Sequence, residues 1–369
     1  MKALATIFLS LISVSGLASV NCALPPAVGG VQYCPNAGYQ TCSIDVPNYS
    51  LGLVQQRYFC LSQPNVAQAN AVFMFHGAGH TGNAVAKHWQ NQTSDSFIIL
   101  PAAEFVSGTR KWNTVNIQNP HYQALETVHG HSDTRFIKTI LEELDSIYSC
   151  NQAAPPVPCI NNYYAAGFSS GAAMVLQLLT RNEFSYWFSG YGAVSNYLDD
   201  AKKAPQQVLP NGNKIGNIND PFTPRPIAFM MGTDERMNLP IKPMISVVEN
   251  GCANPSLIYD ALYCFSSLVD STFYANRLDT AMWLRNRSST VNPAITTMYD
   301  NPTDDTLISS QLYLPDAAVN DAVAVWVGTV INGGHSWPSI NNLKSDPNHS
   351  EDIETSDVLV DFWTDFADW

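Results

Sequence analysis

A serine between two glycines is the feature of this chain with the clearest chemical potential. Ser169 stands in Gly167-Phe168-Ser169-Ser170-Gly171, after an apolar run at 163–166 and before apolar residues with helical spacing. Such a pattern between strand and helix places the serine hydroxyl on a tight turn beyond the end of a sheet. The backbone N–H of Ser170 would then lie at a helix N-terminus, where it stabilises negative charge. We predict that Ser169 is a nucleophile and that Ser170 contributes to an oxyanion hole.

A histidine near the C-terminus could activate this serine. His335 follows the apolar run 323–327 and lies in Asn332-Gly333-Gly334-His335-Ser336-Trp337-Pro338. A serine hydroxyl is a poor nucleophile until a neutral imidazole removes its proton. We predict that His335 is the base and that Trp337 binds substrate.

A carboxylate is needed to orient the imidazole and stabilise its protonated form. Asp234 and Glu235 follow the apolar run 227–231 and Gly232, after the serine in chain order. Asp234 carries the more usual, shorter carboxylate. Glu235 remains the alternative.

A glycine-rich segment follows the apolar run 71–75, in the order His76-Gly77-Ala78-Gly79-His80. Loops of this kind bring backbone donors close to a ligand, so we expect Ala78 to be the second oxyanion donor and His76 to bind substrate. The two histidines lack a third ligand at useful spacing, and we therefore expect no metal and no cofactor.

The remaining pattern indicates how these residues are positioned. Buried strands are predicted at 56–61, 71–75, 97–101, 227–231 and 323–327, and helices at 133–148, 273–284 and 358–366. Their alternation predicts an α/β fold with a mostly parallel, doubly wound sheet and helices on both faces. Trp112 is expected to pack in the core.

The N-terminus indicates export. Residues 1–18 have Lys2, an apolar core at 3–14 and small residues up to Ala18, which is typical of a signal peptide. Residues 19–369 show no repeat or linker and are expected to form a single catalytic domain, with 241–272 as an insertion or lid. We therefore expect a secreted, extracellular protein.

Cysteine usage agrees with export, because none of the eight cysteines has CxxC spacing. We expect all eight in disulfides: Cys22, Cys34, Cys42, Cys60, Cys150, Cys159, Cys252 and Cys264. Proximity along the chain suggests Cys34–Cys42, Cys150–Cys159 and Cys252–Cys264, which leaves Cys22–Cys60, although spacing does not prove connectivity. Glycosylation is expected at four acceptor sequons: Asn48, Asn91, Asn286 and Asn348.

The charge limits the partners. A net charge of −13 argues against nucleic acid and anionic membranes. No segment reaches the roughly 20 apolar residues of a membrane span. We expect a monomer whose partner is an ester substrate.

The histidine segment resembles the GGHxWP block of the polyhydroxybutyrate depolymerase and feruloyl esterase group of secreted serine esterases. The resemblance extends to His76-Gly77, to the helix that begins at Asp133, to 167–174 and to 283–286. It implies an α/β-hydrolase fold with serine, acid and histidine in that chain order. The family's Gly-Thr-x-Asp becomes Gly232-Thr233-Asp234-Glu235, so its spacing points to Glu235 and the acid stays open.

The sequence thus predicts a serine carboxylic-ester hydrolase with an acyl-enzyme mechanism, similar to feruloyl esterases and acting on plant-wall hydroxycinnamate esters or other extracellular esters. A first alternative is an extracellular polyhydroxyalkanoate or other polyester depolymerase on the same machinery. A second is a catalytically inactive binding protein on a hydrolase scaffold.

Overall fold

The computed structural model describes residues 20–24, 27–28, 31–32, 34, 38–48, 53–106, 109–112, 133–198, 207–208, 214–215, 223–232, 272–291, 294–340 and 349–369. Several sequence predictions lie outside these residues: the signal peptide at 1–18, Asp234, Glu235, Cys252, Cys264, Asn348 and residues 241–271 of the expected lid. Thr272, the last residue of that expected lid, begins a helix.

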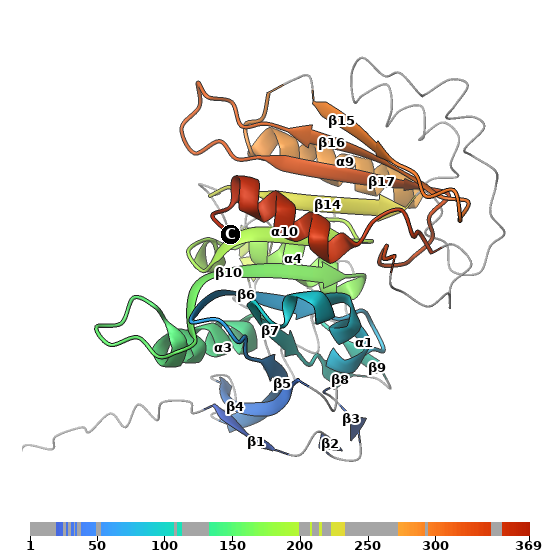
Figure 1. Cartoon of the computed structure of the whole chain (residues 1–369). Helices are drawn as coiled ribbons and strands as arrows, with labels where there is room; N and C mark the ends of the chain where they lie inside the picture. Colours follow the sequence, from blue (N-terminus) through green and yellow to red (C-terminus); the bar gives the residue numbers. More distant parts are fainter. Residues whose placement is uncertain are drawn as a thin grey trace, which may run out of the picture.

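A mixed sheet of eleven strands runs through the molecule (Figure 1). In spatial order its strands are β1 (Asn21–Leu24), β4 (Gln40–Asn48), β5 (Leu53–Ser62), β7 (Ser96–Pro101), β6 (Gln68–Phe75), β10 (Cys159–Phe168), β11 (Phe188–Val194), β14 (Ile227–Gly232), β17 (Val325–Ile331), β16 (Leu307–Tyr313) and β15 (Ile295–Tyr299). Three two-stranded sheets lie outside it: β2 (Ala27–Val28) with β3 (Val31–Gln32), β8 (Glu104–Val106) with β9 (Thr109–Lys111), and β12 (Gln207–Val208) with β13 (Lys214–Ile215).

The expectation of a mostly parallel sheet is corrected. The six central strands from β7 to β17 pair in parallel. The strands at both ends of the sheet, β1, β4 and β5 on one side and β15 and β16 on the other, pair antiparallel. The antiparallel strands arise where consecutive segments fold back on each other, as β4–β5 and β16–β17 do. The sheet therefore has a parallel centre and antiparallel flanks.

Helices cover both faces of this sheet, as expected (Figure 1). One face carries α1 (Gly82–Ala86), the 3-10 helix η1 (Lys87–Gln92) and α10 (Thr355–Phe366), and the other carries α3 (Asp133–Tyr148), α4 (Ser170–Leu179) and α9 (Thr272–Arg287). A short α5 (Asn182–Ser185) follows α4. The sheet has one hydrophobic core on each face. Neighbouring residues of β6 point to opposite faces, so Phe73 packs on the α3–α4 side and Met74 on the α10 side. This arrangement confirms the α/β class.

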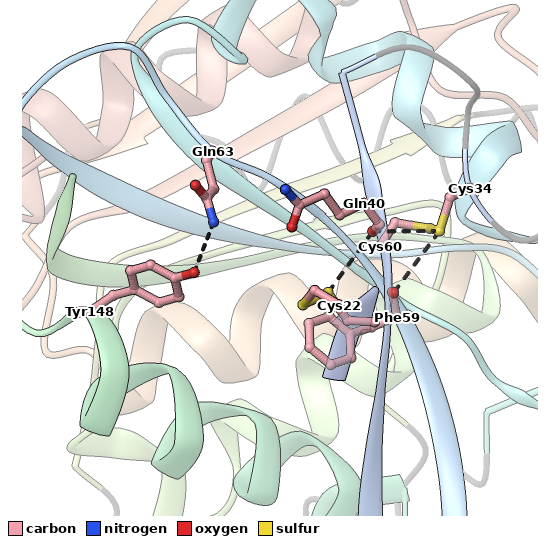
Figure 2. The surroundings of a disulfide bond; sticks show 8 residues. Cys22, Cys34, Gln40, Phe59, Cys60, Gln63 and Tyr148 are labelled. Atoms are coloured by element: carbon pink, nitrogen blue, oxygen red, sulfur yellow. Dashed lines mark hydrogen bonds between the residues drawn. A yellow bond between two sulfur atoms is a disulfide. The ribbon is translucent and has the colours of Figure 1, made fainter. Parts of the chain in front are cut away.

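The cysteine pairing differs from the one that chain proximity suggested. Cys150–Cys159 is confirmed, but the other described bridges are Cys22–Cys42 and Cys34–Cys60 (Figure 2). Strand pairing is the reason. Antiparallel β1 and β4 pair Asn21 with Ser43, and the next residue on each strand is a cysteine, Cys22 and Cys42, with Cα atoms 3.9 Å apart.

Two findings bear on location. The described cysteines are all in disulfides, which is compatible with an extracellular protein. Within the described ranges, no helix combines the length and apolarity that a bilayer crossing requires.

Candidate active site

The carboxyl ends of the parallel strands meet at one edge of the sheet. Ser169 directly follows β10, Ser195 follows β11 and Asn332 follows β17. Each of the three has a left-handed backbone, with φ of 55°, 63° and 59°. Such φ values are uncommon for residues other than glycine and tend to cluster at functional sites. This edge is therefore the candidate active site.

Ser169 sits on the strained turn that its motif predicts. It joins β10 to α4 with φ 55° and ψ −121°. The flanking glycines permit close packing, because a Cβ on Gly171 would lie 2.0 Å from the carbonyl oxygen of Phe75. A Cβ on Gly167 would lie 2.4 Å from the carbonyl oxygen of Gly171. The start of α4 thus rests directly on β6, and no larger residue fits at either position.

The structure brings the predicted nucleophile and base together. The Nε2 atom of His335 lies 2.7 Å from Ser169 Oγ. The histidine loop is fixed at its start, where Asn332 Nδ2 donates to the carbonyl oxygen of Asp305 at 2.8 Å. The ring of His335 also lies against that of Phe168, with centroids 5.1 Å apart. Two residues separated by 166 positions thus form a hydrogen-bonded pair at the sheet edge.

The loop that carries the two candidate acids begins beside the histidine loop. Gly232 ends β14 and pairs with Val330 of β17. A Cβ on Gly232 would lie 2.4 Å from the carbonyl oxygen of Gly333, so glycine is needed for this approach. Asp234 and Glu235 themselves lie outside the described residues, and the choice between them stays a prediction.

The glycine-rich loop after β6 passes beside the serine. A Cβ on Gly77 would lie 3.4 Å from Ser169 Cβ, and Ala78 next to it is exposed. Gly79 has φ of +76° and donates to the carbonyl oxygen of Arg110 at 2.8 Å, which ties the loop to β9. The predicted oxyanion donors Ala78 and Ser170 therefore belong to the two backbone segments that flank Ser169.

His76 does not face a substrate, and its predicted binding role is wrong. The side chain is fully buried. Its Nε2 accepts the backbone N–H of Ala103 at 3.0 Å, so Nδ1 carries the proton and donates to the carbonyl oxygen of Gly77 at 2.8 Å. Burial lowers the pKa of His76 to about 4, which keeps the imidazole neutral. His76 therefore holds the glycine-rich loop in place.

Trp112 supports the same loop from the core. Its side chain is buried, as expected, and its Nε1 donates to the carbonyl oxygen of His76 at 2.8 Å. The ring also stands edge-on to that of Phe75, with centroids 5.2 Å apart. An indole that fills the core thus also fixes the backbone at the end of β6.

Trp337 is also too buried to bind substrate directly, with 2% of its surface exposed, so this second binding prediction is corrected. Its ring packs against that of His88, with centroids 5.4 Å apart. The following Pro338 carbonyl accepts the hydroxyl of Thr355 at the start of α10, at 2.7 Å. Trp337 and its neighbour therefore anchor the histidine loop to α10.

The sequence analysis predicted neither β11 nor the segment that follows it. Gly190 and Gly192 interrupt the apolar pattern of this strand, and glycine is rare in strands. Both glycines make room for α10: a Cβ on Gly190 would lie 2.6 Å from the Trp363 ring, and one on Gly192 would lie 2.7 Å from Leu359. Two closely spaced glycines among apolar residues were the available signal.

His80 is a further missed neighbour of the site. Its side chain is exposed beside the glycine-rich loop. Partial burial, then the positive charge of Lys87 and then that of His335 lower the pKa of His80. The charge of His335 acts on His80, so His80 belongs to the electrostatic surroundings of the proposed base. The glycine-rich loop around it was the available signal.

No family profile and no curated protein matches this sequence. Solved structures of hydrolases and esterases are similar at low identity. Siderophore hydrolase EstB from Aspergillus nidulans is 12% identical, with 93% of this chain and 98% of that chain covered and a TM-score of 0.44. An S-formylglutathione hydrolase from Agrobacterium tumefaciens is 10% identical, with 66% and 98% covered and a TM-score of 0.37. The Bacillus cereus carboxylesterase is 11% identical, with 62% and 79% covered and a TM-score of 0.35. TM-scores this low carry no conclusion about activity.

Proposed function

We propose that this protein is a serine carboxylic-ester hydrolase of the α/β-hydrolase type, with Ser169 as nucleophile and His335 as base. The observation that carries the proposal is the 2.7 Å contact between His335 Nε2 and Ser169 Oγ. It occurs on a left-handed turn between a central parallel strand and a helix, which is the setting of the nucleophile in this class of enzyme.

The proposed reaction has two halves. Ser169 Oγ attacks the ester carbonyl carbon while His335 takes the hydroxyl proton. The backbone N–H groups of Ala78 and Ser170 stabilise the tetrahedral oxyanion, and collapse releases the alcohol with the proton from His335. Water activated by His335 then attacks the acyl-enzyme, releases the acid and restores Ser169. Asp234 or Glu235 stabilises the imidazolium in both halves.

The proposed substrates are extracellular carboxylic esters, with plant-wall hydroxycinnamate esters first and polyesters second. The order rests on the resemblance of the histidine segment to the feruloyl esterase and polyhydroxybutyrate depolymerase group. Secretion after residue 18 and a monomeric state belong to the same proposal. So does glycosylation, for which Asn91 and Asn286 are exposed acceptors.

A fluorophosphonate probe tests the enzyme proposal, since it reacts with activated serines. Stoichiometric labelling of the peptide that contains Ser169 is expected. Failure to label the native secreted protein would favour an inactive binding protein on this scaffold.

A substrate panel tests specificity separately. Ferulate release from wall material is expected to exceed clearing of emulsified polyester. The reverse order would make the protein a polyester depolymerase. Activity on neither substrate, with labelling intact, would refute both substrate classes while leaving the nucleophile in place.

A further inference from the structure

The side chain of Asn196 holds the backbone at the proposed nucleophile. Its Nδ2 donates to the carbonyl oxygen of Ser169 at 2.7 Å. Its Oδ1 accepts the backbone N–H of Tyr197 at 2.8 Å. Because the oxygen is engaged by a donor, the amide orientation is defined and the nitrogen is the atom that faces Ser169.

The segment around Asn196 is itself fixed on three sides. The N–H of Ser195 donates to the carbonyl oxygen of Met230 on β14, at 3.0 Å. The N–H of Leu198 donates at 2.9 Å to the hydroxyl of Thr280 on α9, a fully buried residue. The hydroxyl of Ser195 donates to the carbonyl oxygen of Ser336, beside His335, at 3.3 Å. Asn196 therefore acts from a rigid support.

The Ser169 carbonyl belongs to the same planar peptide unit as the N–H of Ser170. That carbonyl also accepts the N–H of Ala173 within α4, at 3.1 Å. Two donors on one carbonyl fix the plane and so fix the direction of the N–H on its opposite side. Hydrogen bonding to the carbonyl also polarises the peptide unit, which strengthens the N–H as a donor.

We propose that Asn196 is a positioning residue that orients the Ser170 N–H toward the oxyanion of the reaction. The inference rests on the proposed function, because the oxyanion exists only if Ser169 attacks an ester. An N–H aimed at developing charge acts in the transition state more than on the bound ester. Loss of Asn196 should therefore lower kcat and leave KM nearly unchanged.

Asn196→Asp is the sharpest variant. It keeps the oxygen that accepts from Tyr197 and replaces the Nδ2 donor with a carboxylate oxygen, which cannot donate. Asn196→Ala removes both contacts without adding a charge, so agreement between the two variants excludes a charge effect. Asn162→Asp is the matched control, because Asn162 Nδ2 also donates to a backbone carbonyl, that of Asp368, at 3.0 Å on the surface.

The measurements are kcat and KM on p-nitrophenyl acetate, normalised to the sites titrated by a fluorophosphonate so that misfolded protein is not counted. The inhibition constant of a trifluoromethyl ketone, which forms an oxyanion on Ser169, is measured beside them. Removing a whole oxyanion donor costs about 10²–10³ in kcat, and misalignment should cost less. We expect kcat and ketone affinity to fall together by about tenfold to a hundredfold in both Asn196 variants, with KM within about twofold.

Two results would overturn the inference. One is kcat within about twofold of wild type in both Asn196 variants. The other is a parallel change in KM and thermal midpoint, which indicates general loosening. If Ser169→Ala abolishes turnover while both Asn196 variants keep the wild-type kcat, only the role of Asn196 fails. If Ser169→Ala stays active, the proposed function fails.

Discussion

Ser169 keeps a strained backbone because its neighbours hold it on both sides. Its N–H donates to the carbonyl oxygen of Val194 on β11 at 2.9 Å, and its carbonyl accepts from Asn196. Left-handed conformations cost about 1–3 kcal/mol for residues other than glycine and persist only where surroundings impose them. The result is a hydroxyl directed at His335.

A single substitution can also identify the carboxylate that pairs with His335. We expect the true acid to be the residue whose amide variant loses about 10⁴ in kcat, because the histidine then loses its orientation and stabilising charge. Asp234→Asn and Glu235→Gln, made separately, are compared in kcat on a soluble ester. We favour Asp234, and the bystander should lose less than about tenfold. If Glu235→Gln loses most of its kcat while Asp234→Asn stays active, Glu235 is the acid.

The residue types that chemistry requires could be predicted, but the residues that position them could not. Ser169 and His335 stand out because glycines surround them and apolar runs precede them. His76 and Trp337 belong to the same motifs, yet sequence does not say which side of a loop faces the core. Asn196 has no motif, because its role depends on the proximity of β11 to the β10–α4 turn.

Among the elements, α3 is fastened to the sheet by a buried ion pair. Arg57 on β5 lies 2.7 Å from Asp133 at the start of α3, and both side chains are about 95% buried. The guanidinium also covers the Phe136 ring at 4.2 Å from its centroid and donates to the carbonyl oxygen of Ala102 at 3.1 Å. Removing one partner would leave a buried charge with too few partners.

We expect Asp133→Ala to lower the free energy of unfolding by about 3–5 kcal/mol, because the Arg57 guanidinium then remains buried without its closest carboxylate. Urea unfolding monitored by circular dichroism measures the change. Glu142→Gln is the control, since its 3.7 Å pair with Lys138 is exposed on the same helix. That variant should change stability by less than about 0.5 kcal/mol. Equal effects in the two variants would refute a special role for the buried pair.

Elements with a single clear period were predictable, and pairing between them was not. The predicted helix at 133–148 matches α3, because its apolar stripe is regular. Strand β16 escaped prediction because serine and glutamine fill its middle, although Ser309, Ser310 and Gln311 are all buried. Cys22–Cys42 depends on the register of β1 against β4, which chain proximity does not reveal.

At the scale of the whole molecule, the fully buried His76 and the half-buried His88 lie near the candidate-site edge of the sheet. Burial lowers the pKa of His88 to about 3 and that of His76 to about 4, well below the ordinary value of 6.5. His88 packs on Trp337, and His76 holds the glycine-rich loop. The folded protein therefore resists protonation at positions where the unfolded chain accepts protons.

This difference predicts the direction of the pH dependence. Between about pH 6.5 and pH 4 the unfolded chain binds protons that the native state refuses, so the free energy of unfolding should fall as pH falls. The His76 contribution is on the order of 3 kcal/mol, fully present above pH 6.5. Unfolding in urea at a series of pH values measures it. In His76→Gln, whose Oε1 can accept the Ala103 N–H, the free energy of unfolding should fall less steeply as the pH is lowered. The same steepness as in the wild type would contradict the role given to His76.

In the proposed reaction, Ser169 attacks an ester with help from His335. Single-turnover and steady-state hydrolysis of p-nitrophenyl acetate by Ser169→Ala tests it most directly, beside Ser94→Ala as an exposed serine control. We expect a loss of several orders of magnitude in kcat for Ser169→Ala, no acyl-enzyme burst and an unchanged thermal midpoint, with Ser94→Ala like wild type. Retention of more than about a tenth of wild-type turnover by folded Ser169→Ala would contradict it.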